Sequence, residues 1–225
     1  MQRVFDVIFS GVALILLSPL FLPIMLLLRL TGEGEIFFLQ NRVGRGGRHF
    51  KLYKFATMLK NSPNIGMGTV TVKGDPRILP FGVVLRKTKI NELPQLFNIL
   101  KGDMSLIGPR PQTQRCFDAF PISAQHEIKK VRPGLSGIGS IIFRNEENMM
   151  DAQRDPGKFY DEIIMPFKGA LECWYVSNRS IGLYFSLICV TAWVVLSSNL
   201  SLVWLMFTNL PKPPSELKRE LRFID

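Results

Sequence analysis

The sequence predicts a single, mostly helical domain that is flanked by two apolar segments. A chain of 225 residues can bury one sizeable core, and its apolar fraction of 47% is ordinary for a globular protein. Residues 7–28 and 180–210 are almost wholly apolar. Between them, apolar residues recur at three- and four-residue spacing, which is typical of helices with one buried face.

The first apolar segment, 7–28, has about the length of a membrane span. Pro19 and Pro23 fall in its middle, where proline removes a helix hydrogen bond and bends the chain. A cleavage site of small residues is missing after the segment, which favours a retained anchor over a removed signal peptide. The helix either crosses with a kink or breaks before Pro19 and returns to the side it entered from. Arg3 and Arg29 flank its two ends, and because positive charge prefers the cytoplasmic side, the re-entrant geometry is favoured.

The chain is strongly basic, with a formal net charge of +10. Such a charge requires an anionic partner, and the candidates are nucleic acid, anionic lipid headgroups and phosphorylated substrates. An established nucleic-acid motif is missing and an apolar anchor would be superfluous there, so nucleic acid is not expected. The cysteines lack metal-ligand spacing and there are only two histidines, so the site has to use carboxylates and cations.

The stretch 85–112 predicts an amphipathic helix with polar groups at its start. Its apolar stripe consists of Ile90, Leu93, Leu96, Phe97 and Leu100. Asn91 and Glu92 lie where the helix begins, an end that attracts anions, and basic residues including Arg86 precede it. After the helix, the stiff turn 108–111 would hold the Arg110 guanidinium ready for a bidentate phosphate contact. The stretch therefore reads either as a phosphate site containing a carboxylate or as an ordinary helix capped by Asn91.

The segments around this stretch are shorter and richer in turns. Residues 40–49 mix arginine with glycine and predict a flexible basic loop beside lipid headgroups or a diphosphate, or else a solvated turn. Residues 50–58 alternate apolar and polar side chains, as a short strand or a helix edge would. A short polar helix is expected at 122–130, followed by a proline and glycine turn that carries Arg132.

The C-terminal third predicts helices with polar interruptions. Residues 144–155 are highly charged and expected to be solvated, and 159–175 should form a helix that Pro166 kinks. Residues 180–210 read either as one membrane span or as two interfacial helices around a polar break. Residues 211–225 form a polar tail for which disorder is the expectation.

Several motifs together resemble one family. They are QxRxG at Gln40, Arg42 and Gly44, YKF.TM at 53–58, DPR at 75–77, ELPQL followed by LKGDMSLIGPRP in 92–111, and VRPGLSG at 131–137. This set resembles the bacterial sugar transferases, the small monotopic phosphoglycosyl transferases that initiate glycan assembly on a polyprenyl carrier. The resemblance extends over about residues 3–195.

The resemblance implies an α/β-like, mostly helical fold at the bacterial inner (cytoplasmic) membrane. Its parts would be a re-entrant anchor at 1–30, a compact cytoplasmic catalytic domain at 31–178, apolar interfacial helices at 179–210 and the polar tail at 211–225. The implied reaction moves a sugar phosphate from a nucleoside diphosphate sugar, usually a UDP-sugar, to polyprenyl phosphate with Mg²⁺. Membrane lipid is a further partner, and self-association is left open.

The resemblance also assigns roles to individual residues. Glu92 would be catalytic and a Mg²⁺ ligand, Lys54 would support the carboxylate pair, and Arg86, Arg110 and Arg132 would contact phosphate. Arginine suits that role independently, because its planar fork binds phosphate bidentately.

Two positions depart from the family pattern. The family carries an Asp-Glu pair before LPQ, in which the aspartate attacks the diphosphate, whereas this chain has Asn91-Glu92. Ala56 stands where arginine is common. A neutral amide is a poor nucleophile, so a covalent step at Asn91 is not expected. Glu92 would need a local shift to act as the nucleophile in place of Asn91. Alternatively, polyprenyl phosphate attacks the diphosphate directly. A further alternative is a catalytically silent relative that binds nucleotide sugar or lipid phosphate, or that scaffolds glycan enzymes.

Overall fold

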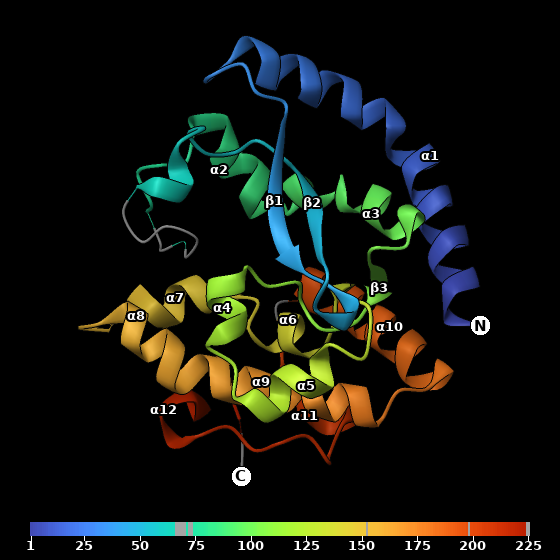
Figure 1. Ribbon diagram of the computed structural model, residues 1–225, viewed down its shortest axis with the longest axis vertical. Coiled ribbons are helices and arrows are strands. Elements are labelled where there is room, and N and C mark those ends of the chain that lie inside the picture. Colours follow the sequence, from blue (N-terminus) through green and yellow to red (C-terminus); the bar gives the residue numbers. More distant parts are fainter. Residues whose placement is uncertain (66–70, 72–73, 152, 198, 224–225) are drawn as a thin grey trace.

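The computed structural model describes residues 1–65, 71, 74–151, 153–197 and 199–223 (Figure 1). Over these residues the fold is mostly helical, at 58%, with two small two-stranded sheets. In Figure 1 a long N-terminal helix arches along one side of the molecule. A central hairpin runs between a smaller group of helices and the larger C-terminal group, which surrounds the main core.

The helix α1, Gln2–Leu30, is continuous and curved (Figure 1). The expected break before Pro19 is absent, because both Pro19 and Pro23 lie inside the helix. Each proline still removes one helix hydrogen bond, which is compatible with the gentle bend. α1 is the one described helix that is long and apolar enough to cross a membrane.

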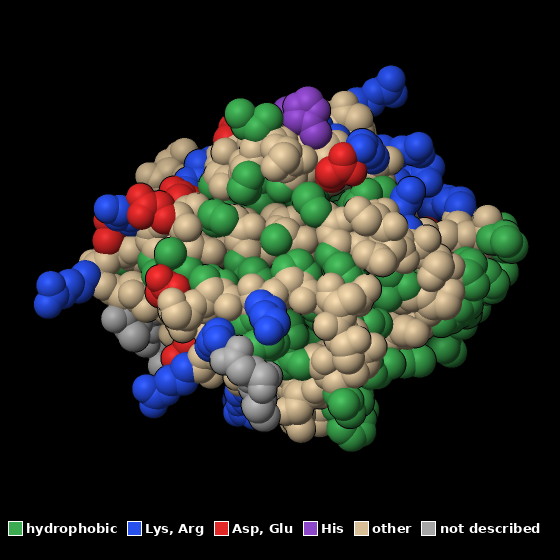
Figure 2. Space-filling model, turned by 90° about the horizontal axis from the view of Figure 1, so that it is seen from below, with side chains coloured by type: hydrophobic (Ala, Val, Ile, Leu, Met, Phe, Trp, Pro, Cys, Tyr) green, Lys and Arg blue, Asp and Glu red, His purple; other side chains and the backbone are tan. Residues whose placement is uncertain are grey.

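Both ends of α1 contact the globular part of the chain. Near its start, Asp6 is buried and accepts hydrogen bonds from the Ser105 hydroxyl at 2.9 Å and the Tyr184 hydroxyl at 3.0 Å. Near its end, Leu28 packs in one apolar cluster with Phe55. The opposite side of the helix is exposed and apolar, and Figure 2 shows apolar side chains along the edge where α1 lies in Figure 1. The helix therefore lies along the domain and does not project from it.

The hairpin confirms the strand reading of 50–58 as far as Phe55, whereas the loop expected at 40–49 is wrong over residues 40–43, which belong to the preceding strand. β1, Phe37–Val43, pairs antiparallel with β2, His49–Phe55. The connecting turn η1, Arg45–Gly47, needs its glycines, because Gly46 and Gly47 have φ angles of 68° and 76°. The turn keeps Arg42 of β1 and Lys54 of β2 within regular strands.

The expected helix at the centre of the chain begins later than predicted. α2, Pro80–Lys87, is followed by the single turn η3, Ile90–Glu92, and then by α3, Gln95–Lys101. The prediction that Phe97 belongs to the buried apolar face is wrong, because its side chain is 43% exposed. The helix starts after Pro94, and this start turns Asn98 inward instead. Asn98 then accepts the Tyr53 backbone N–H at 3.0 Å and donates to the Lys51 carbonyl at 2.7 Å, which fixes α3 to β2.

The second sheet brings two turns into close contact. β3, Ser105–Ile107, runs parallel to β4, Gly134–Ser136, and α4, Gln114–Asp118, and α5, Ile122–Ile128, connect them. The helix expected at 122–130 is therefore confirmed. A Cβ on Gly134 would lie 2.1 Å from the Gly108 nitrogen, so glycine is required where the turns meet.

The C-terminal helices complete the main core. They are α6, Ile138–Ile142; α7, Glu146–Asp151; α8, Pro156–Phe159; a π-helical turn η4, Tyr160–Ile164; α9, Met165–Ser177; α10, Ile181–Ser197; α11, Ser201–Met206; and α12, Ser215–Lys218. Pro166 lies in the first turn of α9, directly after the π-helical turn, which is the expected interruption. Residues 180–210 form two helices, and Tyr184 and Leu187 of α10 are buried in the core.

Two C-terminal expectations are wrong. Residues 144–155 are not simply solvated, because Met149 and Met150 of α7 are buried. The tail 211–225 is not disordered over its described part, because Leu217 and Leu221 are fully buried against the main core. In both segments a few apolar residues among many charges are enough to dock a short helix.

Candidate active site

Glu92 and Arg110 form the centre of the site. η3 presents Glu92 between α2 and α3, and the turn after β3 presents Arg110. The guanidinium Nη2 of Arg110 donates to Oε1 of Glu92 at 2.8 Å, with Glu92 mostly buried. Burial would raise the pKa of Glu92, but Arg110 and Lys54 hold that pKa well below its ordinary value. The carboxylate is therefore ionised at neutral pH.

Lys54 lies beside this pair as a poorly compensated cation. It is half-buried on β2, and burial together with neighbouring arginines lowers the pKa of its amine to about 7, although Glu92 opposes this. Within the described residues, its ammonium makes no hydrogen bond or ion pair. A phosphate group would supply the missing anion.

Arg42 of β1 lies near Glu92 and Arg110, although the sequence did not single it out as a site residue. Its Nη1 donates to the Pro111 carbonyl at 3.0 Å and its Nη2 to the Gln40 amide oxygen at 2.5 Å. Burial lowers the pKa of Arg42 to about 10, with Arg110 adding to the effect. The available signal was its place in the Gln40-Arg42 motif, within the basic segment 40–49 that was expected beside lipid headgroups or a diphosphate.

Asn91 is buried but is not a helix cap. Neither η3 nor α3 has a side-chain cap, so the reading of 85–112 as an ordinary helix capped by Asn91 is wrong. Asn91 is 5% exposed, and its Oδ1 has no hydrogen-bond partner among the described residues. A buried acceptor without a partner costs free energy, which a hydrogen bond from a ligand or coordination of a cation would recover.

The structure places the other predicted arginines differently. Arg86, at the end of α2, lies near Lys54 and is paired with Glu147 of α7 at 3.0 Å. Arg132 donates from Nε to the Gly102 carbonyl at 2.8 Å, and no contact among the described residues joins it to Glu92 or Arg110. Arg86 thus lies at the edge of the site with its guanidinium already paired with the Glu147 carboxylate. Arg132 supports the chain after α3.

Glu172 of α9 supports Arg110 from the interior. Its Oε1 accepts the Arg110 backbone N–H at 3.3 Å, and the residue is 1% exposed. Burial raises the pKa of Glu172 to about 7. A Cβ on Gly139 would lie 2.4 Å from the same oxygen, so this carboxyl needs a glycine opposite it. The sequence did not single out Glu172 as a site residue; the available signal was a single carboxylate among the apolar residues of a helix.

The residues fit a magnesium ion only together with substrate. No group of three or more His, Cys, Asp or Glu side chains that could hold a metal occurs among the described residues. Mg²⁺, however, is commonly bound by one or two protein oxygens, waters and substrate phosphates. Glu92 and Asn91, which are neighbours in the sequence, would supply oxygen donors of this kind.

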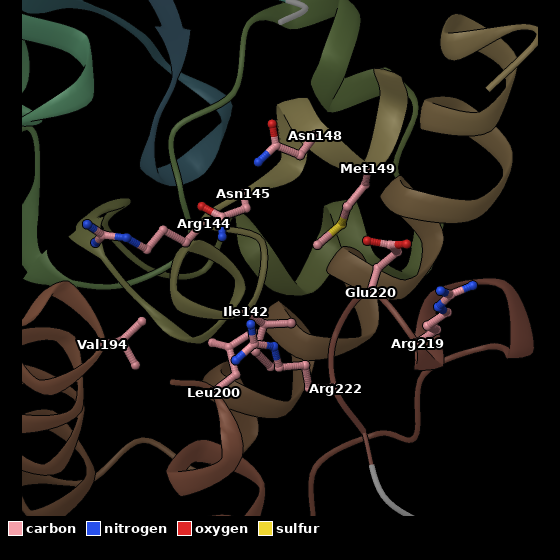
Figure 3. Close-up of a pocket in the computed structure, with 10 residues that line it drawn as sticks. All are labelled: Ile142, Arg144, Asn145, Asn148, Met149, Val194, Leu200, Arg219, Glu220 and Arg222. Atoms are coloured by element: carbon pink, nitrogen blue, oxygen red, sulfur yellow. The ribbon is translucent and has the colours of Figure 1, made fainter. Parts of the chain in front are cut away.

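A cavity of about 380 Å³ lies elsewhere in the molecule, between α6, α7, α10 and the C-terminal tail. Figure 3 shows its lining residues, none of which is a predicted site residue. The guanidinium groups of Arg144 and Arg219 point to opposite sides in Figure 3, and Glu220 belongs to the same lining. This cavity is therefore separate from the Glu92 and Arg110 site.

Comparison with known proteins shows what the chain is similar to. The sequence model of a family described as bacterial sugar transferase matches residues 1–198. The chain is 44% identical over 145 residues to UDP-N-acetylgalactosamine-undecaprenyl-phosphate N-acetylgalactosaminephosphotransferase of Aeromonas hydrophila, which covers 63% of this chain and 34% of that protein. It is 37% identical over 159 residues to the exopolysaccharide production protein ExoY of Rhizobium meliloti (strain 1021), covering 64% and 70% respectively.

A third relative extends over more of the chain. Undecaprenyl-phosphate galactose phosphotransferase of Salmonella typhimurium is 33% identical over 211 residues, which is 87% of this chain and 40% of that protein. The chain thus spans less than half the length of the Aeromonas and Salmonella relatives. Because the family match includes α1, the hairpin, the Glu92 and Arg110 site and all of α10, the chain belongs to the bacterial sugar transferase family.

Proposed function

We propose that this chain transfers a sugar phosphate from a UDP-sugar to polyprenyl phosphate at a membrane surface. The observation that carries the proposal is the surplus of positive charge around Glu92. Arg42, Lys54 and Arg110 all influence this one carboxylate, and Lys54 and Arg42 have no carboxylate bound to them within the described residues. Cations held this close repel one another, so the arrangement favours a ligand with several negative charges, such as a diphosphate.

The donor and acceptor follow from the relatives. The names of the Aeromonas and Salmonella relatives specify undecaprenyl phosphate, and the former also names a UDP-sugar. We propose the same classes of substrate for this chain: a UDP-linked sugar as donor and polyprenyl phosphate as acceptor.

Asn91 leads us to propose direct transfer without a covalent enzyme intermediate. An oxygen of polyprenyl phosphate attacks the phosphorus that carries the sugar, and the bond from that phosphorus to the bridging oxygen breaks. UMP leaves with the electron pair. Arg110 and Lys54 stabilise the charge on the transferring phosphoryl group, which needs positioning and electrostatics more than a protein nucleophile. Glu92 fixes the Arg110 guanidinium by its 2.8 Å hydrogen bond. Bound Mg²⁺, held by Glu92 and the Asn91 amide oxygen, would add Lewis-acid stabilisation.

We further propose that α1, although unbroken, inserts into the bacterial inner membrane from one side only and anchors the chain in the cytoplasmic leaflet. A helix that crossed the membrane would separate its two ends by the bilayer thickness. Here Asp6 near the start and Leu28 near the end both contact the same domain, and the outer face is apolar. This geometry supports one-sided insertion, and the dense cations after Arg29 favour the cytoplasmic side.

A second candidate function is binding without transfer. Its support is Asn91 itself, because the family nucleophile is absent while the surrounding cations are retained. Such a protein would hold a nucleotide sugar or lipid phosphate, or bring glycan enzymes together at the membrane.

The test measures UMP release from a panel of UDP-sugars with undecaprenyl phosphate and Mg²⁺. We expect turnover by the natural chain, loss with Glu92→Gln, and no change with the control Glu162→Gln, whose side chain is 63% exposed. Without acceptor, the natural chain should release no UMP, whereas Asn91→Asp should release about one equivalent if it regains a nucleophile. Turnover by Asn91→Asp alone would refute transfer by the natural chain and favour the binding function.

A further inference from the structure

Arg42 is a half-buried cation whose hydrogen-bond partners do not neutralise its charge. The Pro111 carbonyl and the Gln40 amide oxygen accept from two of its nitrogens, and both acceptors are neutral. Its Nε is shielded from solvent and has no hydrogen-bond partner among the described residues. A guanidinium in such surroundings is costly unless an anion completes it, because partial burial removes water without supplying a counter-charge.

The surroundings of Arg42 specify where that anion would lie. Its contact with the Pro111 carbonyl holds it beside the turn that carries Arg110, and the two guanidinium groups influence each other electrostatically. Arg110 is already bound to Glu92 on one side. Two like charges held near one another by rigid elements, a strand and a proline-rich turn, favour an anion that contacts both.

We propose that Arg42 is a substrate-binding residue that contacts a phosphate of the bound nucleotide together with Arg110. This inference rests on the proposed function and adds a residue of the first strand to a site otherwise built from β2, η3 and the turn after β3. Arginine is suited to the position because its fork has five N–H donors, so the Pro111 and Gln40 contacts leave a further donor on each terminal nitrogen for a phosphate.

A purely structural role for Arg42 is the rival explanation. In that case the side chain would only brace the turn through the Pro111 carbonyl, and its loss would weaken every ligand that depends on the turn. A phosphate contact predicts something different, because the loss should grow with the number of phosphates on the ligand. The nucleoside therefore serves as the reference for each variant.

The experiment compares binding of UDP, UMP and uridine to the full chain in lipid nanodiscs, for the natural sequence, Arg42→Gln and Arg42→Lys. The matched control is Arg48→Gln, an exposed arginine of the same hairpin whose side chain makes no hydrogen bond within the described part of the chain. Thermal unfolding of each variant identifies samples that fail to fold.

We expect Arg42→Gln to weaken UDP binding about 10- to 100-fold, the usual range for a charge-assisted hydrogen bond, with little effect on uridine. Arg42→Lys should recover part of the loss, and Arg48→Gln should match the natural chain. Equal losses for UDP and uridine, or unchanged UDP binding by a folded Arg42→Gln variant, would overturn the inference and leave the proposed function standing. If the natural chain binds neither UDP nor UMP, the proposed function fails, and this inference with it.

Discussion

The guanidinium of Arg110 and the carboxylate of Glu92 form a hydrogen-bonded ion pair at 2.8 Å across the candidate active site. The two residues are separated by β3 and α3 in the chain, so the pair fixes η3 against the turn that follows β3. Glu172 accepts the backbone N–H of the same arginine from the core side. Arg110 is therefore held at both its backbone and its side chain, which prepares its remaining donors for a ligand.

Removing the Arg110 guanidinium should destabilise the fold as well as the site. Arg110→Gln leaves the Glu92 carboxylate mostly buried without its cation. We expect the free energy of unfolding to fall by about 1–3 kcal/mol, less than for a fully buried pair because the Arg110 side chain is 32% exposed. Chemical denaturation measures this. Arg110→Gln combined with Glu92→Gln should recover part of the loss, and strictly additive effects would show that the pair is not coupled.

Binding of a UDP-sugar should depend on the protonation of Lys54. Because burial lowers the pKa of Lys54 to about 7, the ammonium form that attracts phosphate becomes populated as the pH falls through 7. We expect affinity to rise over that interval. Asn91→Asp places a negative charge on η3, which packs against β2, and should move the midpoint to higher pH.

Two variants identify the group responsible for that midpoint. Lys54→Arg keeps the positive charge at every pH and should abolish the transition near pH 7. Glu172 also titrates near 7, so Glu172→Gln is the control and should leave the transition in place. A transition that survives Lys54→Arg but disappears in Glu172→Gln would show that Glu172, and not Lys54, controls the pH dependence of binding.

Glu172→Gln should stabilise the protein at high pH and leave it unchanged at low pH. Burial raises the pKa of Glu172 from 4.5 to about 7, so the folded state binds a proton between these values that the unfolded state releases. The free energy of unfolding of the natural chain therefore falls as the pH rises from 4.5 to 7. Glutamine keeps the acceptor for the Arg110 N–H but has no charge to bury.

The expected gain is about 2–3 kcal/mol at pH 8 and nothing at pH 4, measured by denaturation at each pH. Glu162→Gln, which alters an exposed carboxylate, serves as the control and should follow the natural chain. Parallel pH profiles for Glu172→Gln and the natural chain would mean that Glu172 is ionised in the folded state without cost.

Local chemistry made part of this site predictable from the sequence. The proline-rich turn around Arg110 and the carboxylate at Glu92 are recognisable because their function depends on residues close together in the chain. Arg42 and Glu172 are not, because each meets Arg110 or Pro111 across about 60 residues or more.

The prediction for Phe97 failed for a related reason: periodicity gives the spacing of a buried face but not the residue at which Pro94 allows the helix to start. The buried Leu217 and Leu221 show that tertiary packing can recruit a segment whose composition reads as polar.

Removing the Glu147 carboxylate should strengthen nucleotide binding. Glu147 lies 3.0 Å from the guanidinium of Arg86, a residue to which the family resemblance assigns a phosphate contact. With Glu147 half exposed, the pair contributes little to stability, so a substrate can displace it at modest cost. We expect Glu147→Gln to lower the Kd for a UDP-sugar by about 2- to 5-fold.

Glu127→Gln is the matched control, because it removes a carboxylate from another exposed ion pair, with Lys130. It should leave the affinity unchanged. Weaker binding by Glu147→Gln would mean that the carboxylate holds Arg86 in its binding position and does not compete with the ligand.

Membrane association should depend on the outer face of α1. Leu16 is 72% exposed on the side of the helix that faces away from the domain, so its substitution removes an apolar contact with lipid but no contact within the fold. Leu16→Asp should reduce sedimentation with vesicles of anionic bacterial lipids at least several-fold, because a carboxylate in the acyl region costs about 2–3 kcal/mol. Ile122→Asp, at a 74% exposed position on α5, introduces the same charge and should sediment like the natural chain. If both variants lose association equally, added negative charge is responsible; if neither does, α1 does not insert.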